Sequence, residues 1–567
     1  MTRILCALLA ALVASCAVVP DRPAPNGEPA HAQIAVTAHP LATQAALAML
    51  DKGGTPADAA VAAQMVLGLV EPQSSGLGGG TFVMNWDAGS AKLTAYDGLA
   101  SAPSQVTASL RTDIDGKLLP SESSQRGGRT VAVPGTLAVL AMVHARYGRL
   151  SWSELFEPAI RLAENGFPMP SYLHGIVVQP NAVKYLSDMQ SLYFDAQGKA
   201  LPVGATVRNP ALAKTLRRIA SGGPSAFLDG DGAQTIVDSA QRGFRPTLMS
   251  AQDLRDYRPA EREPICGPFL AFRVCTMPPS SFGGIVVLQV LQMVEARAAG
   301  HYDFDDAGFA HLYAEAGQLA QADRRKYVGD PDFVQVPTEA LADPAYVRAR
   351  AQLIDPDRAA SRVQAGTPTG SIATLTPDAS DPQTATSQIA IVDRAGNAMS
   401  ITTTINLNFG SRLMADGFVL NNAMTNFSAA PKPGETIANQ MAPRKRAVSS
   451  MAPTVVFDRE GRPVVVGGSA GGGPIVDYIA SSLIDMLANG RTPAQALARG
   501  HITTATAGKV QLEQGTSAAA LAPALAAKGH QVEQVPLLSG LGFLKRTSEG
   551  WIGAADPRRD GKALGSD

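Results

Sequence analysis

A change of composition near residue 385 constrains the fold of this chain more than any other feature. Residues 364–385 are mostly Thr, Pro, Ala, Ser, Asp and Gly, a composition typical of a mobile linker. Directly after them, residues 388–392 form the apolar run of a buried strand, and residues 398–406 alternate like a second strand. Before the linker, residues 153–350 are mainly helical in pattern. Helices in the middle and strands in the last third predict an α+β fold, with sheets sandwiched between helical layers.

The first 16 residues predict export and lipid anchoring. One arginine precedes a short apolar run that ends in Val13-Ala14-Ser15-Cys16, a sequence that resembles a bacterial lipobox. We therefore expect residues 1–15 to be a lipoprotein-type signal peptide, Cys16 to carry the lipid and residues 16–33 to be a flexible tether. The expected location is the periplasm, on the outer membrane, with membrane contact only through the anchor. The alternative is a plain signal peptide cleaved after a small residue.

Charge and cysteine usage exclude several other classes of function. The 567 residues carry a net charge of −1 without a basic stripe, so nucleic acid is not an expected partner. Cys266 and Cys275 flank a Gly-Pro turn between two short predicted strands, and export makes a disulfide between them plausible. No cysteine lies near a histidine in a metal-ligand spacing, so neither a metal nor another cofactor is expected.

Thr386 is the candidate nucleophile because it lies where the linker meets the strand. Peptide cleavage before Thr386 would free an α-amino group with a pKa of about 7.7–8.0. Such an amine accepts the proton of the residue's own hydroxyl near neutral pH, so no histidine base is required. The sequence therefore favours an enzyme that uses its N-terminal threonine as nucleophile.

Short motifs occur along nearly the whole chain. In chain order they are His39-Pro40-Leu41-Ala42, Glu71-Pro72, Ser75-Gly76-Leu77-Gly78-Gly79-Gly80, Val133-Pro134-Gly135-Thr136, Pro279-Ser280-Ser281-Phe282-Gly283-Gly284, Thr386-Ser387-Gln388, Asn421-Asn422 and Ser449-Ser450-Met451-Ala452-Pro453-Thr454. Together, and in this order, they resemble the gamma-glutamyltranspeptidase family from about residue 34 to the C-terminus.

The resemblance implies a four-layer αββα sandwich made from one self-cleaving precursor. Residues 34–385 would form the large subunit, with additional helices, and residues 386–567 the small catalytic subunit. The implied activity is γ-glutamyl transfer and glutathione hydrolysis, on a small amide or peptide substrate, through an ester on the nucleophile.

The resemblance also implies residue roles. Thr386 is the nucleophile, Thr404 hydrogen-bonds it, and Gly471 and Gly472 supply the backbone N–H groups of an oxyanion hole. The implied substrate contacts are Asn406, Ser449 and Ser450.

Three positions depart from the family pattern. Leu99 and Ala100 stand where an arginine and a glutamate should clamp the α-carboxylate of the substrate, and neutral Asn426 stands where an acidic residue should receive the α-ammonium. Loss of the arginine clamp and of the acidic partner would weaken γ-glutamyl recognition by roughly three to six kcal/mol. The sequence is compatible with a γ-glutamyl enzyme and with an amidase or acylase for other acyl groups. Three arginines are candidates to replace the clamp: Arg412, Arg444 and Arg446.

Two rival interpretations come from other classes. Gly467-Gly468-Ser469-Ala470-Gly471 fits the G-x-S-x-G motif, follows a predicted strand and precedes a predicted helix, as an α/β-hydrolase nucleophile does. In that case Asp485 and either His501 or His530 would complete the triad. The other rival is a lipoprotein that kept the fold and lost catalysis.

Overall fold

The computed structural model describes most of the chain from residue 29 onward. The predicted signal peptide, the lipidated Cys16 and most of the tether lie outside the described residues. Among the residues described, no helix is long and apolar enough to cross a bilayer. The ranges left out are 1–28, 108–116, 118, 180–186, 243, 373, 379, 381–384, 429–431 and 433.

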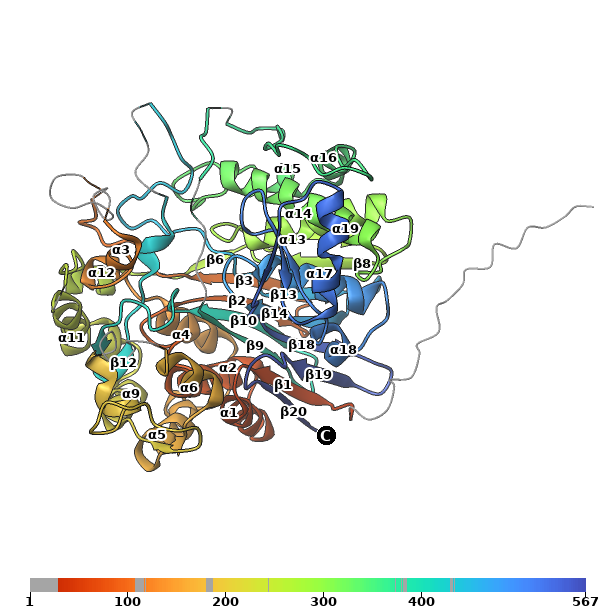
Figure 1. The fold of residues 1–567 in the computed structure, drawn as a ribbon. Coiled ribbons are helices and arrows are strands. Elements are labelled where there is room, and N and C mark those ends of the chain that lie inside the picture. The colour runs from red at the N-terminus through yellow and green to blue at the C-terminus, as the bar shows by residue number, and fades with distance from the viewer. Residues whose placement is uncertain are drawn as a thin grey trace, which may run out of the picture.

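Two antiparallel sheets stacked face to face form the centre of the molecule (Figure 1). The first sheet has the order β20 (Lys562–Ser566), β1 (Gln33–Thr37), β9 (Thr386–Val392), β10 (Ala398–Thr404), β2 (Gly80–Asp87), β3 (Lys92–Gly98) and β6 (Ala260–Arg262). The second has the order β19 (Trp551–Ala555), β18 (Gly540–Arg546), β14 (Pro463–Ala470), β13 (Thr454–Phe457), β8 (Phe272–Thr276) and β7 (Ile265–Phe269).

Helices cover the outer face of each sheet. The first sheet carries α1 (Pro40–Asp51), α2 (Pro56–Val70) and α4 (Thr136–Tyr147), and the second carries α13 (Gly283–Arg297) and α17 (Ile475–Leu487). Further out, α14 (Ala307–Tyr327) and α16 (Pro344–Ala351) pack on α13. The predicted four-layer αββα arrangement is confirmed. The further helices that pack beside the first sheet's layer are η3 (Trp152–Phe156), α5 (Glu157–Asn165) and α9 (Pro210–Gly222).

The alternation of side chains in β9 explains why this strand is buried on both faces. Ile389 and Ile391 join the apolar core shared with α1, α2 and α4. Ala390 and Val392 point the other way, into the core between the sheets. Because side chains alternate along a strand, a run that is apolar on both faces fits only a central strand between two covered faces.

The strands around the composition change differ from expectation at their ends. The strand predicted at 388–392 begins earlier, at Thr386. The strand predicted at 398–406 ends at Thr404, because Asn406 has a φ of +83°, a left-handed conformation that breaks a strand.

The disulfide prediction is confirmed, and the hydrolase rival is wrong. Cys266 and Cys275 are bonded and face each other across the β7–β8 hairpin. Ser469 is fully buried within β14, where it pairs with Leu541 of β18, and its hydroxyl donates to the carbonyl of Ala470 at 2.6 Å. A nucleophile elbow requires a sharp strand-to-helix turn at the serine, which an interior strand position does not provide.

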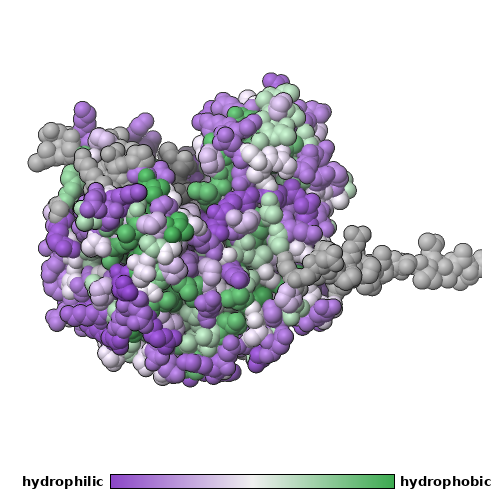
Figure 2. Space-filling model, turned by 60° about the horizontal axis from the view of Figure 1, so that its bottom comes forward, coloured by the Kyte–Doolittle hydropathy of each residue, from purple (hydrophilic) through white to green (hydrophobic). Residues whose placement is uncertain are grey.

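The surface seen in Figure 2 is hydrophilic over most of its outline, with hydrophobic residues interspersed. Large exposed hydrophobic side chains among the described residues are scattered along the sequence, from Met142 to Leu538. These exposed side chains therefore do not by themselves indicate a binding site.

Candidate active site

Thr386 is the first residue of β9 and is 3% exposed. It lies opposite Thr404 in the β9–β10 pairing. The hydroxyl of Thr404 donates to the carbonyl oxygen of Ala385, the residue before Thr386. The backbone N–H of Asn406 in turn donates to the Thr404 hydroxyl at 2.8 Å, so this hydroxyl is oriented from behind. In the uncut chain, Thr404 thus polarises the Ala385 carbonyl, which a nucleophile would have to attack to cut the chain before Thr386.

Arg559 holds the other side of Thr386. Its Nη1 donates to the carbonyl oxygen of Thr386 at 2.9 Å, and its Nε donates to the carbonyl of Ser539 at 2.9 Å. The guanidinium also lies over the Tyr172 ring, 4.6 Å from the centroid. Sequence reasoning missed Arg559, because it lies 173 residues from Thr386 and belongs to no recognised motif.

The buried carboxyl group of Glu71 contacts Ser387, the residue directly after Thr386. The Ser387 hydroxyl donates to Glu71 Oε2 at 2.7 Å, and the Ser75 hydroxyl donates to Ser387 at 3.0 Å. Burial raises the pKa of Glu71 to about 7, and the nearby charge of Arg559 partly opposes this shift. The Glu71-Pro72 motif was noticed in the sequence, but nothing there indicated that Glu71 reaches the residue next to Thr386.

The two candidate oxyanion glycines have backbone conformations that favour glycine. Gly471 has a φ of +130° and Gly472 a φ of +69°. A Cβ atom on Gly471 would lie 2.6 Å from the Tyr478 ring. The Ser450 hydroxyl donates to the carbonyl of Gly472 at 2.6 Å, which joins the predicted serine pair to this turn.

The backbone of Leu538 lies close both to the glycine turn and to Arg559, which binds Thr386. Its carbonyl oxygen lies 3.4 Å from the position of a Cβ on Gly471 and accepts from Arg559 Nη2 at 3.3 Å. Arg559 also donates to the carbonyl of Thr386, so its guanidinium lies near both the glycine turn and the candidate nucleophile.

Asn406 lies between Thr404, the neighbour of Thr386, and the segment that contains Asn426. Its Nδ2 donates to the Thr425 hydroxyl at 2.9 Å and to the carbonyl of Asn422 at 3.2 Å. Asn426 follows directly, at the end of η5 (Ala423–Asn426). The Oδ1 atom of Asn426 is buried without a hydrogen-bond partner among the described residues. Such an acceptor is costly unless a bound molecule or water satisfies it.

Asn439 ties the segment before the nucleophile to this region. Its Nδ2 donates to Asp378 Oδ2 and to the carbonyl of Asn426, both at 2.8 Å. Its Oδ1 accepts from the backbone N–H of Val448, the residue before Ser449, at 3.1 Å. Asp378 belongs to the predicted linker, so a described part of that linker runs beside the candidate substrate contacts.

The remaining serine, Ser449, is held in its backbone by a neighbouring motif. Its carbonyl accepts from the N–H of Phe282 at 2.9 Å, and its hydroxyl accepts from the N–H of Met451 at 3.3 Å. The Pro279–Gly284 motif and the serine pair therefore pack together.

Leu99 is buried at 4% exposure, and its backbone is fixed on both sides. Its N–H donates to Asp97 Oδ1 at 3.0 Å, and its carbonyl accepts from the Tyr257 hydroxyl at 2.8 Å. The same Asp97 oxygen lies 3.4 Å from Nε of buried Arg446.

Two of the arginines considered as substitute clamps are already paired with carboxylates. Arg446 also lies 3.6 Å from Asp332, and its backbone N–H donates to Asp330 at 2.8 Å. Arg444 is exposed and pairs with Asp256 at 3.2 Å. The charges of Arg444 and Arg446 are thus neutralised within the protein.

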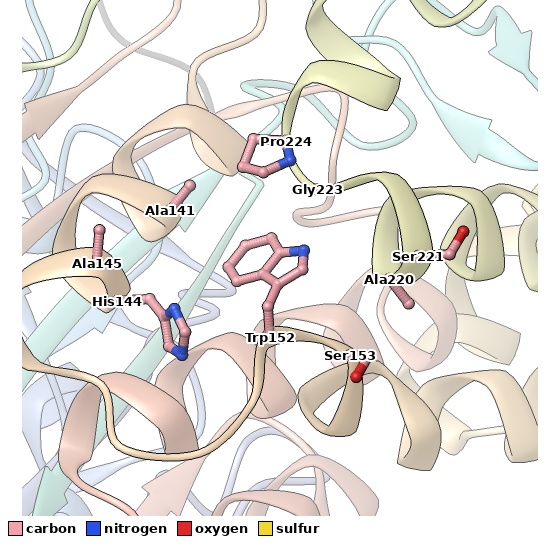
Figure 3. A pocket seen from close by; sticks show the side chains of 9 residues that line it. All are labelled: Ala141, His144, Ala145, Trp152, Ser153, Ala220, Ser221, Gly223 and Pro224. Atoms are coloured by element: carbon pink, nitrogen blue, oxygen red, sulfur yellow. The ribbon is translucent and has the colours of Figure 1, made fainter.

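One cavity of about 440 Å³ lies elsewhere in the molecule (Figure 3). It opens among α4, η3 and the end of α9, with the Trp152 indole at its centre. His144, at its edge, is bound to buried Asp58 at 3.2 Å and to the carbonyl of Leu150 at 3.1 Å. None of the predicted site residues lines this cavity, so it does not compete with the site at Thr386.

Comparison with known proteins agrees with this geometry. Residues 42–566 match the family model described as Gamma-glutamyltranspeptidase. The chain belongs to the gamma-glutamyltranspeptidase family. Membership confirms the family predicted from the motifs and the predicted enzyme class, an N-terminal nucleophile hydrolase.

The relatives carry two kinds of name. The glutathione hydrolase proenzyme of Bacillus subtilis (strain 168) is 34% identical over 540 residues, covering 93% of this chain and 90% of the relative. The acylase ACY 1 proenzyme of Pseudomonas sp. (strain SE83) is 33% identical over 540 residues, covering 93% and 92%. The crystal structure of cephalosporin acylase from Bacillus halodurans superposes with a TM-score of 0.80 at 26% identity, covering 96% of this chain and 98% of that one.

Proposed function

We propose that this family member cuts itself before Thr386 and then transfers or hydrolyses the acyl group of an amide through an ester on that residue. In the first step the Thr386 hydroxyl attacks the carbonyl carbon of Ala385. The peptide C–N bond breaks, an ester forms and the α-amino group is released. Water then hydrolyses the ester, which leaves a carboxylate on Ala385 and restores the hydroxyl of Thr386. The products would be a large-subunit polypeptide, made of residues 34–385 and the tether before them, and a small subunit of residues 386–567.

The hydrogen bond from Thr404 to the Ala385 carbonyl carries this proposal. It withdraws electron density from the carbonyl next to the candidate nucleophile, and so supports attack at that carbon. In the mature enzyme the freed α-amine would act as base for each substrate. Gly471 and Gly472 are proposed as donors to the oxyanion, with their turn braced by Ser450.

Family membership indicates γ-glutamyl compounds such as glutathione as acyl donors. A specific observation favours a second candidate, an acyl group without the free amino acid head. Leu99 and Asn426 carry no charge, and Arg444 and Arg446 are already opposed by carboxylates. The unpartnered Oδ1 of Asn426 suits a neutral N–H or O–H donor on the substrate.

Export and lipid anchoring complete the proposal. The signal and lipobox patterns support a periplasmic protein held to the outer membrane through Cys16. The Cys266–Cys275 disulfide fits an oxidising compartment.

Mass spectrometry of the mature N-termini tests the cleavage. We expect two polypeptides, one of which begins with Thr386, and a single uncut chain for Thr386→Ala. Thr386→Ser keeps a hydroxyl and is expected to mature. Cleavage elsewhere, or maturation of Thr386→Ala, would overturn the mechanism. A wild-type chain that stays uncut would leave an inactive family member as the alternative.

Turnover of two matched substrates tests the acyl group. γ-Glutamyl-p-nitroanilide and glutaryl-p-nitroanilide differ only in the α-amino group. Preference for the glutaryl compound supports the acylase candidate, and preference for the γ-glutamyl compound supports the family activity.

A further inference from the structure

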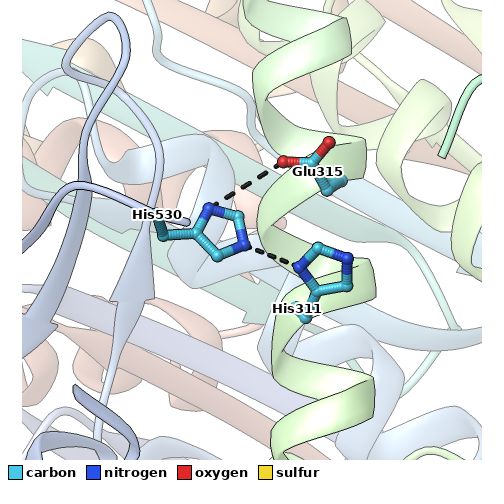
Figure 4. Close-up of side chains that lie close together, drawn as sticks. All are labelled: His311, Glu315 and His530. Atoms are coloured by element: carbon cyan, nitrogen blue, oxygen red, sulfur yellow. Dashed lines mark hydrogen bonds and ion pairs between the residues drawn. The ribbon is translucent and has the colours of Figure 1, made fainter. Parts of the chain in front are cut away.

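Three side chains of types that can bind a metal ion, His311, Glu315 and His530, lie close together, and all three are far from Thr386 in the sequence. His311 and Glu315 project from α14, one turn apart on the same face. His530 reaches them from the turn between α19 (Ala522–Ala527) and β17 (Val532–Val535), as Figure 4 shows. One ligand atom from each residue lies within 4.8 Å of the other two.

Hydrogen bonds fix how these ligands are presented. His311 Nε2 lies 2.7 Å from the carbonyl oxygen of Asp355, which can only accept, so this nitrogen carries a proton and Nδ1 is the nitrogen that faces His530. Glu315 Oε2 accepts from the N–H of Ala360 at 3.1 Å, while Oε1 faces His530. Metal-binding histidines and carboxylates typically have such outer partners, which set the tautomer and the orientation.

His530 lies between the other two side chains. Its Nε2 lies 2.7 Å from His311 Nδ1, so these two nitrogens share one proton. Its Nδ1 lies 3.8 Å from Glu315 Oε1, which is too long for a hydrogen bond. Because the Glu315 carboxylate is buried, its charge requires compensation.

The neighbouring charges do not resolve this arrangement. Lys528 donates to the carbonyl of Pro356 at 2.9 Å and lies 3.8 Å from the Asp357 carboxylate. The carboxylate of Asp355 accepts from the N–H of Asp357 at 2.9 Å. A divalent cation among the three ligands would instead bind the lone pairs of both imidazoles and offset the buried carboxylate.

We propose that His311, Glu315 and His530 bind a divalent transition-metal ion, with Zn²⁺ the best match. Two imidazole nitrogens and one carboxylate oxygen suit Zn²⁺, whereas Mg²⁺ and Ca²⁺ prefer oxygen ligands alone. Zn–N bonds of about 2.0–2.1 Å in tetrahedral geometry place two nitrogens about 3.3 Å apart. The distance between His311 Nδ1 and His530 Nε2, which is 2.7 Å here, therefore has to widen by about 0.6 Å, and water would be the fourth ligand.

The ion would join the two parts of the molecule on either side of Thr386. His311 and Glu315 precede that residue and His530 follows it. This linking role rests on the proposed cleavage, but metal binding itself does not. Sequence spacing gave no metal motif because His311 and His530 are 219 residues apart.

Metal content and affinity test the site. Tag-free protein is stripped with EDTA, titrated with ZnCl₂ by calorimetry and, after dialysis, analysed for metal by mass spectrometry. We expect one Zn²⁺ per chain, at least tenfold weaker binding in Glu315→Gln and His530→Gln, and unchanged binding in His301→Gln, which removes an exposed histidine. Wild-type protein without stoichiometric Zn²⁺, or with affinity unaffected by Glu315→Gln and His530→Gln, would overturn the proposal.

A second measurement does not depend on those variants folding. The thermal midpoint of wild-type protein is compared in EDTA, ZnCl₂ and MgCl₂, and we expect a rise with Zn²⁺ alone. Equal midpoints in all three would count against the site. The uncut Thr386→Ala variant is expected to bind Zn²⁺ as the wild type does, so a failure of self-cleavage and a failure of metal binding are distinguishable.

Discussion

The hydroxyl of Thr404 donates a hydrogen bond to the carbonyl oxygen of Ala385, the residue directly before the candidate nucleophile Thr386. This contact exists because β9 and β10 pair with Thr386 opposite Thr404. The N–H of Asn406 orients the same hydroxyl from its other side. The sheet therefore holds the peptide bond before Thr386, which the proposed cleavage would break, in a defined hydrogen-bonded position.

Replacing Thr404 with valine should slow self-cleavage. The change keeps the shape of the side chain and removes the donor to the Ala385 carbonyl, a loss typically of about 10²–10³ in rate. Thr404→Ser, which restores the hydroxyl, is the matched control. The measurement is a gel time course after cell-free synthesis, in which appearance of the small subunit is followed. Maturation of the valine variant at the wild-type rate would show that this hydrogen bond does not assist cleavage.

Restoring both charges should shift substrate preference. In Leu99→Arg/Asn426→Asp, the arginine would contact the carboxylate that both substrates carry. The aspartate would contact the α-ammonium that only the γ-glutamyl compound has, and this charge-assisted contact contributes roughly 1.5–3 kcal/mol to the difference. We expect the ratio of kcat/KM for γ-glutamyl over glutaryl p-nitroanilide to rise at least tenfold.

The neutral pair Leu99→Met/Asn426→Gln is the control for changes in side-chain size alone. Complete processing on a gel shows that each variant has folded. An unchanged ratio in a fully processed charged variant would mean that these two positions do not contact the head group.

Glu71 should make stability depend on pH. Its pKa is raised from 4.5 to about 7 in the folded chain, so between these values the folded state holds more protons than the unfolded state. The contribution of Glu71 to the free energy of unfolding is therefore largest below about pH 4.5 and falls as the pH rises to about 7, by at most roughly 3 kcal/mol.

Glu71→Gln removes this term, so the variant should gain stability relative to the parent chain between pH 5 and pH 7.5. Urea unfolding in the uncut Thr386→Ala background measures the difference, with both parts kept in one chain. A difference that stays the same at the two pH values would contradict a raised pKa.

The Cys266–Cys275 disulfide should stabilise the β7–β8 hairpin at the edge of its sheet. The bond closes a loop of about ten residues, which corresponds to about 2–3 kcal/mol in the chain-entropy description. Reductant should lower the urea midpoint of the uncut parent chain and leave that of Cys266→Ser/Cys275→Ser unchanged. A parent chain indifferent to reductant would show that the bond does not contribute.

The sequence by itself determined the family, the layered α+β architecture and the candidate nucleophile. Those features are encoded locally: apolar periodicity defines strands and helices, and short motifs such as Thr386-Ser387-Gln388 persist as continuous strings. The departures at Leu99 and Asn426 were also readable, because each lies inside such a string.

Only the tertiary structure decided which groups surround Thr386. Arg559, Glu71 and Asn439 reach the site through hydrogen bonds between segments far apart in the chain, and pairing across sheets leaves no local pattern. It also placed Ser469 inside a strand, where the G-x-S-x-G pattern had suggested a turn. The His311–Glu315–His530 cluster likewise exists only after folding, because a spacing motif records ligands on one segment and these come from two.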